Sequence, residues 1–189
     1  MFLRVLLAGS DPDLVDAVAA SLGRLTDIEL VQATGGAGLV EAVAAAAPDV
    51  IIVGAAGPDR DGLAAIGRIV RDRPLPVVMF VDADDPAFME AAIAAGVSSY
   101  NVVGTALPEV GPIVRTAVAL FRRHRQTTEE LAAAQTSLAE RAVIARAKAR
   151  LIRHRDLSEP EAYGLLRRRA MNEGRRIADI AREILEAGE

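Results

Sequence analysis

Short apolar runs alternate with longer Ala-rich stretches over the first 121 residues. Five of these runs have the length and the Val, Ile and Leu content of strands buried on both faces, and they span residues 3–8, 28–33, 50–54, 77–81 and 98–102. The Ala-rich stretches between them are long enough for crossover helices and span residues 12–23, 36–47, 60–72 and 86–95. This alternation predicts an α/β domain with a five-stranded parallel sheet and right-handed crossovers.

Residues that favour helix ends stand at the borders of these segments. Asp11-Pro12 and Asp85-Pro86 each place an N-capping side chain directly before a proline in the first helical turn. Gly96 is typical of a residue that ends a helix. The sequence therefore predicts where the first helix starts and where the fourth helix starts and ends.

The pattern changes after residue 107. No Pro or Gly lies between Pro112 and Pro160, and a weak heptad stripe runs through this stretch. Polar residues on such a stripe are typical of a two-stranded coiled coil whose register they fix. We therefore predict a coiled-coil linker helix at 113–145 and a homodimer, with contacts through Phe121, Thr128, Leu131, Gln135 and Leu138. The alternative is a single long helix packed on its own domain.

The last segment predicts three helices. The long helix continues to about His154, and the third helix spans 177–187. Between them, Ser158 and Glu161 form an S-x-x-E capping box that opens the second helix, and Gly174 ends it. Apolar residues that recur every three or four positions predict a small three-helix bundle with its own core.

Charge divides the chain unequally. Residues 1–121 carry 7 basic and 15 acidic side chains, whereas residues 122–189 carry 15 basic and 11 acidic ones. The net charge of −4 therefore combines an acidic front of −8 with a basic tail of +4. A basic tail indicates a polyanionic partner for that part of the chain. Aromatic residues make up only 3% of the chain, which argues against base stacking on a sheet surface.

Other kinds of site find little support. The chain has no Cys and only two well-separated His residues, so we expect no metal site, no catalytic residues and no cofactor. The Gly-rich segment 33–38 lacks the Lys-Ser/Thr pair of a phosphate-binding loop and is interpreted as a connector. The longest apolar runs have strand length and residues 1–7 do not resemble a signal peptide, so we expect a cytoplasmic protein without membrane contact.

The α/β domain, with its segment Ala95-Gly96-Val97-Ser98-Ser99-Tyr100, resembles the flavodoxin-like receiver domain of response regulators over residues 1–121. The resemblance implies an acidic pair after the first strand, a phosphoacceptor Asp ending the third, a Thr or Ser ending the fourth and a Lys ending the fifth. At these positions the chain has, in order, Gly9 with Ser10, then Gly54, Val81 and Val103.

These replacements remove the chemistry of phosphoryl transfer. Glycine has no carboxylate that could accept a phosphoryl group, and Mg²⁺ loses its anionic oxygen ligands. Without the Lys, no fixed cation stabilises the phosphoryl oxygens. We therefore predict a pseudo-receiver domain that is not phosphorylated. The aspartates in the loop from Asp82 to Asp85 could instead bind a metal ion. The simpler interpretation is that they cap a helix or are solvated.

The C-terminal segment carries a second resemblance. Ala147-Lys148, Ser158-Glu159-Pro160-Glu161-Ala162-Tyr163 and Leu166-Arg167-Arg168-Arg169-Ala170-Met171 follow one another in the order and spacing typical of the ANTAR domain. The resemblance covers about residues 130–187 and, with the receiver-like half, suggests the nitrate-assimilation type of transcription antiterminator. The amidase-operon type is a more distant relative with the same plan.

This resemblance implies a mechanism and partners. Proteins of this kind bind paired hairpins in the leader of a nascent transcript, so that an overlapping terminator hairpin does not form. A nutrient-sensing protein typically sequesters the regulator until the inducer arrives, and in the nitrate branch that partner resembles a periplasmic-type nitrate-binding protein kept in the cytoplasm. The expected partners are therefore RNA, a second copy of the chain and a nitrate- or nitrite-type sensor.

Basic side chains of this segment are the candidates for RNA contact. Arg146, Arg150 and Arg153 share a helix face, and the resemblance favours Lys148 and Arg167. The predicted RNA-binding residues are Arg146, Lys148, Arg150, Arg153, Tyr163, Arg167, Arg168, Arg175 and Arg176. Such cations neutralise phosphates and make salt-sensitive contacts, and guanidinium planes stack on unpaired bases. The alternative is a solvated basic face whose charges pair with Glu159, Glu161, Glu173 and Glu183.

The sequence departs from the ANTAR pattern at a few positions. Ala149 and Asp156 replace usual glycines and Arg150 replaces a usual apolar residue, so strain is expected where Asp156 ends the first helix. The matching residues Ala147, Ala170 and Met171 are expected in the core, and packing is also the simpler role for Tyr163.

Two other functions remain open at this point. One is a DNA-binding response regulator, although Asp179, Glu183 and Glu186 make the third helix too acidic to suit a major groove. The other is a protein-interaction scaffold that uses the long helix, for which no salt-dependent affinity for nucleic acid is expected.

Overall fold

The computed structural model describes residues 2–55, 57, 59–103, 107 and 109–187. The chain forms two compact units, one up to His124 and one from Arg125 onward, and each is described by itself. The helix α5 (Val110–Arg155) contributes residues to both units.

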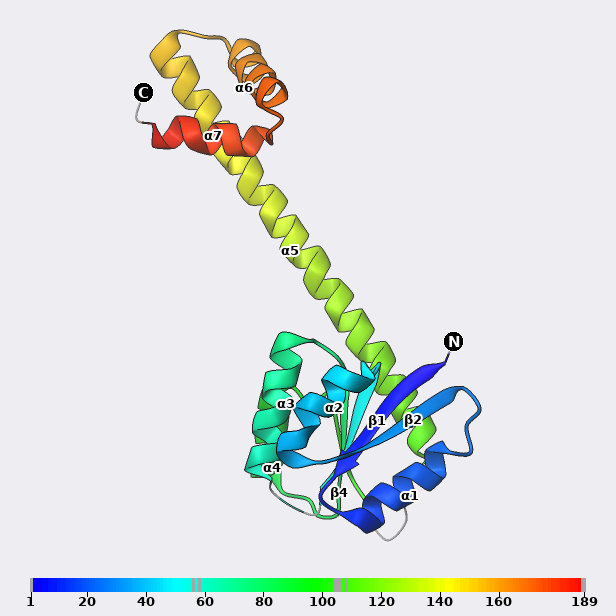
Figure 1. The fold of residues 1–189 in the computed structure, drawn as a ribbon. Coiled ribbons are helices and arrows are strands. Elements are labelled where there is room, and N and C mark those ends of the chain that lie inside the picture. The colour runs from blue at the N-terminus through cyan, green and yellow to red at the C-terminus, as the bar shows by residue number, and fades with distance from the viewer. Residues whose placement is uncertain (1, 56, 58, 104–106, 108, 188–189) are drawn as a thin grey trace. The chain divides into compact units, whose positions relative to one another are not determined.

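The N-terminal unit is a parallel five-stranded sheet covered by helices on both faces (Figure 1). The strands lie in the order β2-β1-β3-β4-β5, and every pair is parallel. Their bounds are Leu3–Gly9 for β1, Ile28–Thr34 for β2, Val50–Ala55 for β3, Val77–Val81 for β4 and Ser99–Val102 for β5. The predicted α/β fold and receiver-like topology are thus confirmed.

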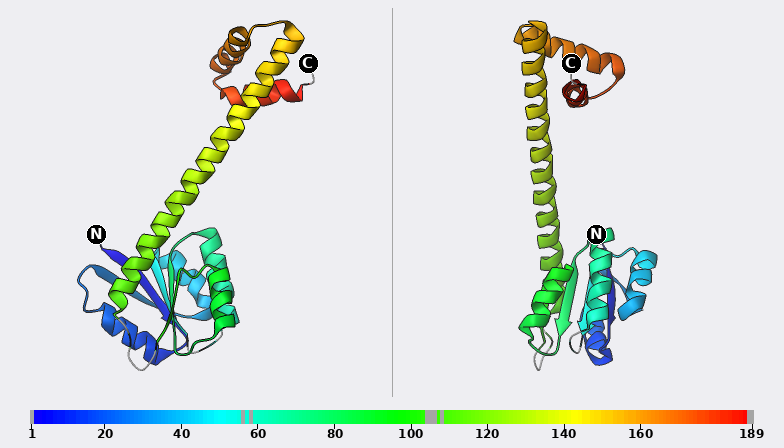
Figure 2. Two further views of the ribbon diagram at one scale, coloured as in Figure 1. Left: turned by 180° about the vertical axis from the view of Figure 1, so that it is seen from behind. Right: turned by 90° about the vertical axis from the view of Figure 1, so that its left-hand side faces the viewer.

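Helices of two groups cover the two faces of this sheet (Figure 2). The helices are α1 (Pro12–Leu22), the 3-10 turn η1 (Gly36–Gly38), α2 (Leu39–Ala46), α3 (Arg60–Asp72) and α4 (Pro86–Ala95). The side chains of β1 alternate, so Leu6 packs with α2, α3 and α4 while Val5 and Leu7 pack with α1 and the start of α5. Burial on both faces explains why the strands read as continuous apolar runs.

Aspartates at the helix starts serve as caps. The Asp11 and Asp85 side chains each accept hydrogen bonds from two backbone amides of the helix that follows, at 3.0 to 3.2 Å, and Asp59 accepts one from Gly62 at 2.9 Å. Within the described part of the chain, no group of three or more acidic, His or Cys side chains could hold a metal ion. These bonds give Asp85 the structural role of a cap.

The C-terminal unit is a small helical bundle. The end of α5 packs against α6 (Glu159–Glu173) and α7 (Ile177–Glu186) around a core of Leu151, Leu166 and Ile180. The Ser158 amide donates to the Glu161 carboxylate at 2.8 Å in the predicted capping box, and Gly174 ends α6 with a φ of 62°. The predicted three-helix bundle is therefore confirmed. Among the described helices, none has both the length and the apolar character needed to cross a membrane.

The turn after α5 places a non-glycine residue in the left-handed region. Asp156 has a φ of 51°, at a position where the ANTAR pattern usually has Gly. Asp tolerates this conformation better than most residues, but glycine adopts it without steric cost. The conformation agrees with the strain expected at this position.

Replacing Asp156 by Gly should raise the free energy of unfolding of the C-terminal unit by about 0.5–1 kcal/mol. Asp156→Ala should lower it by about 1 kcal/mol, because Ala meets the left-handed penalty without the polar side chain that eases it. Urea unfolding of the full chain, followed by circular dichroism, measures both changes. If the Ala variant were as stable as the wild type, the backbone here would not be strained.

Candidate nucleic-acid interface

Two hollows share residues at the end of α5 and form one continuous basic surface. Arg146, Arg150 and Arg153 line the first hollow, which α7 closes at Leu185. The Arg150 guanidinium also donates a hydrogen bond of 3.3 Å to the Leu185 carbonyl, which helps to hold its stem against α7. Arg150 and His154 line the second hollow as well, which we call the bundle groove.

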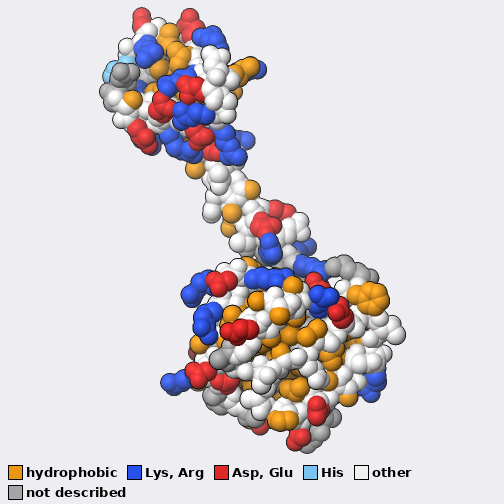
Figure 3. Space-filling model, viewed as in Figure 1, with side chains coloured by type: hydrophobic (Ala, Val, Ile, Leu, Met, Phe, Trp, Pro, Cys, Tyr) orange, Lys and Arg blue, Asp and Glu red, His pale blue; other side chains and the backbone are white. Residues whose placement is uncertain are grey.

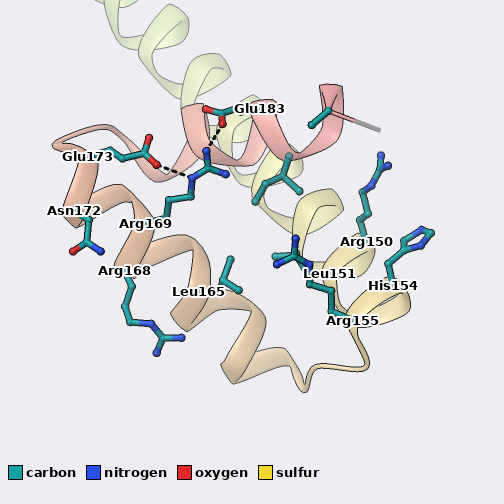
Figure 4. A pocket seen from close by; sticks show the side chains of 12 residues that line it. Arg150, Leu151, His154, Arg155, Leu165, Arg168, Arg169, Asn172, Glu173 and Glu183 are labelled. Carbon is teal, nitrogen blue, oxygen red and sulfur yellow. Dashed lines mark hydrogen bonds and ion pairs between the residues drawn. The ribbon is translucent and has the colours of Figure 1, made fainter. Parts of the chain in front are cut away.

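The bundle groove lies between α5, α6 and α7 and has a volume of about 430 Å³ (Figure 4). Leu151, Leu165 and Ile184 form its apolar part. Polar and charged side chains complete the lining, and these are Arg150, His154, Arg155, Arg168, Arg169, Asn172, Glu173 and Glu183. The groove therefore joins an apolar floor to a rim in which cations outnumber carboxylates.

Both carboxylates of the groove belong to an ion-pair network between α6 and α7. Arg169 bonds Glu173 at 2.7 Å and also Glu183, and Arg175 bonds Glu173 at 2.9 Å and Glu183 at 2.6 Å. The hydrogen bonds from these two arginines hold the pKa of the Glu173 carboxyl and that of the Glu183 carboxyl below their usual values. Both carboxylates are therefore ionised and neutralised at pH 7, and Arg169 and Arg175 have a structural role.

Lys148 is also engaged by a carboxylate. Its amine lies 2.6 Å from the Glu159 carboxylate, and its side chain is only 24% exposed. The hydrogen bond from Lys148 is the main reason why the pKa of Glu159 lies below its usual value. A phosphate that approached Lys148 would have to displace Glu159.

The remaining predicted residues lie elsewhere on the bundle. Arg167, Arg175 and Arg176 line a third hollow with Met171, while Tyr163 lies on the surface of α6 with 43% of the residue exposed. Met171 is 70% exposed, so the prediction that it lies in the core was wrong. The residues of α6 that face the core are Ala162, Leu166 and Ala170. The Arg176 guanidinium lies 3.5 Å from Glu140 and is largely exposed.

Exposed arginines without a carboxylate partner are the clearest electrostatic feature of the bundle. Within the described residues, this group comprises Arg141, Arg146, Arg153, Arg155, Arg167 and Arg168. Acidic and basic side chains are mixed on the face of the C-terminal unit in Figure 3, so pairing decides which cations are available to a ligand. Sequence reasoning missed His154, although the run Arg153-His154-Arg155 at the helix end was a visible signal.

The five positions that correspond to the phosphorylation site of receiver domains lie at the carboxyl ends of the strands. Gly9 pairs with Gly54 across β1 and β3, and the Ser10 amide donates to the Gly54 carbonyl at 3.0 Å. The Val103 amide donates to the Val81 carbonyl at 2.7 Å. The hollow beside Gly9 and Gly54 measures about 20 Å³, which leaves room for little more than a water molecule.

The predicted coiled-coil positions of α5 within the C-terminal unit face outward. Leu131 and Leu138 are 57% and 64% exposed, and the polar members of the stripe, Thr128 and Gln135, are exposed as well. Phe121 lies in the N-terminal unit and is half-buried. Exposed leucines seven residues apart on one helix are typical of a coiled-coil seam.

Both units of the chain are similar to known proteins. The ANTAR domain family matches residues 132–185. Transcriptional regulatory protein PdtaR of Mycobacterium tuberculosis is 29% identical over 184 residues, which cover 97% of this chain and 89% of PdtaR.

Among solved structures, the signal receiver domain of NarL from Mycobacterium tuberculosis is similar with a TM-score of 0.53 and 20% identity, covering 64% of this chain and 97% of that one. NtrX from Brucella abortus is similar with a TM-score of 0.56 and 20% identity, covering 68% of this chain and 30% of that one. At this level of identity the two structures support the receiver-like fold and nothing further.

Proposed function

We propose that the chain is a transcription regulator of antiterminator type that acts by binding RNA. The match of residues 132–185 to the ANTAR domain family and the receiver-like fold in front of them support this proposal. It binds paired hairpins in the leader of a nascent transcript and so prevents an overlapping terminator hairpin from forming. A sequestering sensor protein of the nitrate or nitrite type controls it, and phosphorylation does not. The match of residues 132–185 to the ANTAR domain family and the similarity to PdtaR support a regulatory role rather than an enzymatic one.

One observation carries this proposal. Exposed arginines of the bundle, among them Arg153 and Arg168, have no carboxylate partner within the part of the chain that the structure describes. Unpaired surface guanidinium groups bind phosphate oxygens without first having to break an ion pair. Their position on an ANTAR bundle favours RNA as the source of those phosphates.

The proposed dimer is supported by the exposed Leu131 and Leu138 on α5. Two copies joined along α5 would present two basic surfaces, which suits a target made of two hairpins. Two linked sites also bind such a target more tightly than one site does, because the second contact becomes intramolecular.

A binding titration tests the proposal. The purified chain is mixed with a hairpin RNA pool, with a common stem and randomised loops, and separately with duplex DNA of the stem sequence. Hairpin RNA should bind more tightly, and its affinity should fall steeply as salt rises, because bound phosphates release counterions. Tighter binding of duplex DNA would favour a DNA-binding response regulator. Absence of salt-dependent binding to either would favour a protein-interaction scaffold.

Replacing Glu159 by Gln should raise the affinity for hairpin RNA about three- to tenfold, because it removes the carboxylate that occupies Lys148. Fluorescence anisotropy at low salt measures the change. Glu129→Gln is a matched control, since it releases Arg125 on α5 outside the bundle core and should leave the affinity nearly unchanged. An unchanged affinity for the Glu159 variant would show that Lys148 does not contact RNA.

Incubation with acetyl phosphate should leave the mass of the protein unchanged. The position of the phosphoacceptor is Gly54, and Val103 stands where the phosphoryl group would need a Lys. Intact-protein mass spectrometry after incubation with Mg²⁺ measures the result, with a competent receiver domain as the positive control. A stable added phosphoryl group would refute control without phosphorylation.

A further inference from the structure

A line of basic side chains follows the last turns of α5. Arg146, Arg150 and His154 stand four residues apart, so they lie on one face of the helix, and all three line the first hollow. A rise of about 1.5 Å per residue places successive members roughly 6 Å apart along the helix axis. This spacing is close to that between neighbouring phosphates of an RNA strand. Position 154 therefore extends a line of cations that suits a phosphate backbone.

The imidazole of His154 is open to a ligand. The residue is exposed and lines both the first hollow and the bundle groove. Figure 4 shows its ring and the Arg150 guanidinium projecting on the same side of the end of α5. Among the described residues, the imidazole has no hydrogen-bond or ion-pair partner. An incoming phosphate therefore has no internal bond of His154 to break.

The other charged groups around His154 keep their charge near neutral pH. Those that share the two hollows with it are Arg146, Arg150, Arg153 and Arg155 of α5, Arg168, Arg169 and Glu173 of α6, and Glu183 of α7. Arginines stay protonated, and the hydrogen bonds from Arg169 and Arg175 hold the pKa of both glutamate carboxyls below the usual value. Among the described side chains that line these hollows, only His154 is of a type that changes its charge between about pH 5.5 and 8.

We infer that His154 is a phosphate contact of the basic surface that responds to pH. When protonated, the imidazole donates a charge-assisted hydrogen bond to a phosphate oxygen of the RNA, and when neutral it offers only a weaker, uncharged donor. A phosphate beside the ring also stabilises the imidazolium, so RNA binding and protonation favour one another. Affinity for RNA therefore rises as the pH falls through the imidazole range. This inference rests on the proposed function and adds to it a regulation by pH.

The test measures the affinity of the full chain for one hairpin RNA by fluorescence anisotropy, from about pH 5.5 to pH 8 at constant ionic strength. The hairpin is the tightest binder from the pool with a common stem and randomised loops. Affinity should rise about three- to tenfold as the pH falls across this range. The slope of log affinity against log salt should also be steeper at the acidic end by about 0.7–0.9, because one more phosphate is neutralised.

Two variants of His154 separate its charge from its shape. His154→Gln should match the wild type at the alkaline end and lose the rise at the acidic end, because an amide is not protonated in this range. His154→Arg should bind tightly at every pH, because a guanidinium stays charged. His124→Gln is the matched control, since His124 is the other His of the chain, lies in the N-terminal unit and should leave the rise intact. Circular dichroism at both ends of the range checks helical content.

The outcomes separate the inference from the proposed function. Tight hairpin binding with a flat pH profile would overturn the inference and leave the proposed function standing. A rise that persists in the His154→Gln variant, or that disappears in the His124→Gln variant, would also overturn it, because another group would then be responsible. Failure of any hairpin to bind at either end of the pH range would refute the proposed function itself.

Discussion

Simultaneous replacement of Arg153, Arg155 and Arg168 by Ala should weaken hairpin RNA binding about a hundred- to a thousandfold at low salt. These arginines are exposed, and no described carboxylate pairs with them, so each is available to a phosphate oxygen. Each lost contact should also reduce the slope of log affinity against log salt by about 0.7–0.9, so the triple variant should show a much flatter dependence.

A second triple variant with the same change in net charge controls for long-range electrostatics. Arg115, Arg125 and Arg182 pair with Asp27, Glu129 and Asp179 respectively, and all three lie outside the basic surface. Their replacement by Ala should change affinity only a few-fold. Fluorescence anisotropy across a salt series compares the two triple variants. Equal losses in both would mean that net charge alone, and not the basic surface, attracts RNA.

The fold could be predicted from the sequence because the period of its apolar residues agrees with its capping residues. Val77–Val81 is apolar throughout and is buried on both faces, so strand is the only element that fits its length. Asp85-Pro86 and Gly96 bracket α4 at both ends. The 3-10 turn at Gly36–Gly38 could not be predicted, because a Gly-rich segment is compatible both with a connector and with the start of a helix.

The interface could be predicted only in part, because charge pairing depends on tertiary packing. From the sequence, Lys148, Arg175 and Arg153 were all predicted to contact RNA. Lys148, however, meets Glu159 across the turn between α5 and α6, and Arg175 meets Glu183 across the turn between α6 and α7. Neither pair follows from helix periodicity within one element, so the sequence could not separate occupied cations from available ones.

Met171 illustrates the same limit for apolar residues. It matches a recurrent position of the ANTAR pattern, and a Met beside the buried Ala170 is easily taken for core. The phase of α6 is set by Ala162, Leu166 and Ala170, which repeat every four residues and face the other helices. Met171 falls one position outside that repeat and therefore faces solvent.

Replacing Gly9 by Ala should lower the free energy of unfolding of the N-terminal unit by about 2–3 kcal/mol. A Cβ atom at this position would fall well inside contact distance of the Gly54 carbonyl oxygen and 2.8 Å from a Val15 methyl group. The Gly54 carbonyl is held in place by the Ser10 amide and by the β1–β3 pairing, so it cannot move aside without a shift of the sheet. Urea unfolding of the full chain, with its midpoint and slope, measures the loss.

Gly54→Ala is the matched control for this prediction. A Cβ atom there would meet only Leu14 and Val15 side chains at 3.4 Å, so the stability should change by no more than about 1 kcal/mol. The contrast bears on the lost phosphorylation site, because an acidic residue at position 9 would need more space than Ala. If Gly9→Ala proved as stable as the wild type, β1 and β3 could separate enough to admit a carboxylate. If the Gly9→Ala variant unfolds readily, position 9 has no room for the acidic side chain that binds Mg²⁺ in receiver domains. An acidic residue at this position would then destabilise the N-terminal unit before it could restore phosphoryl transfer.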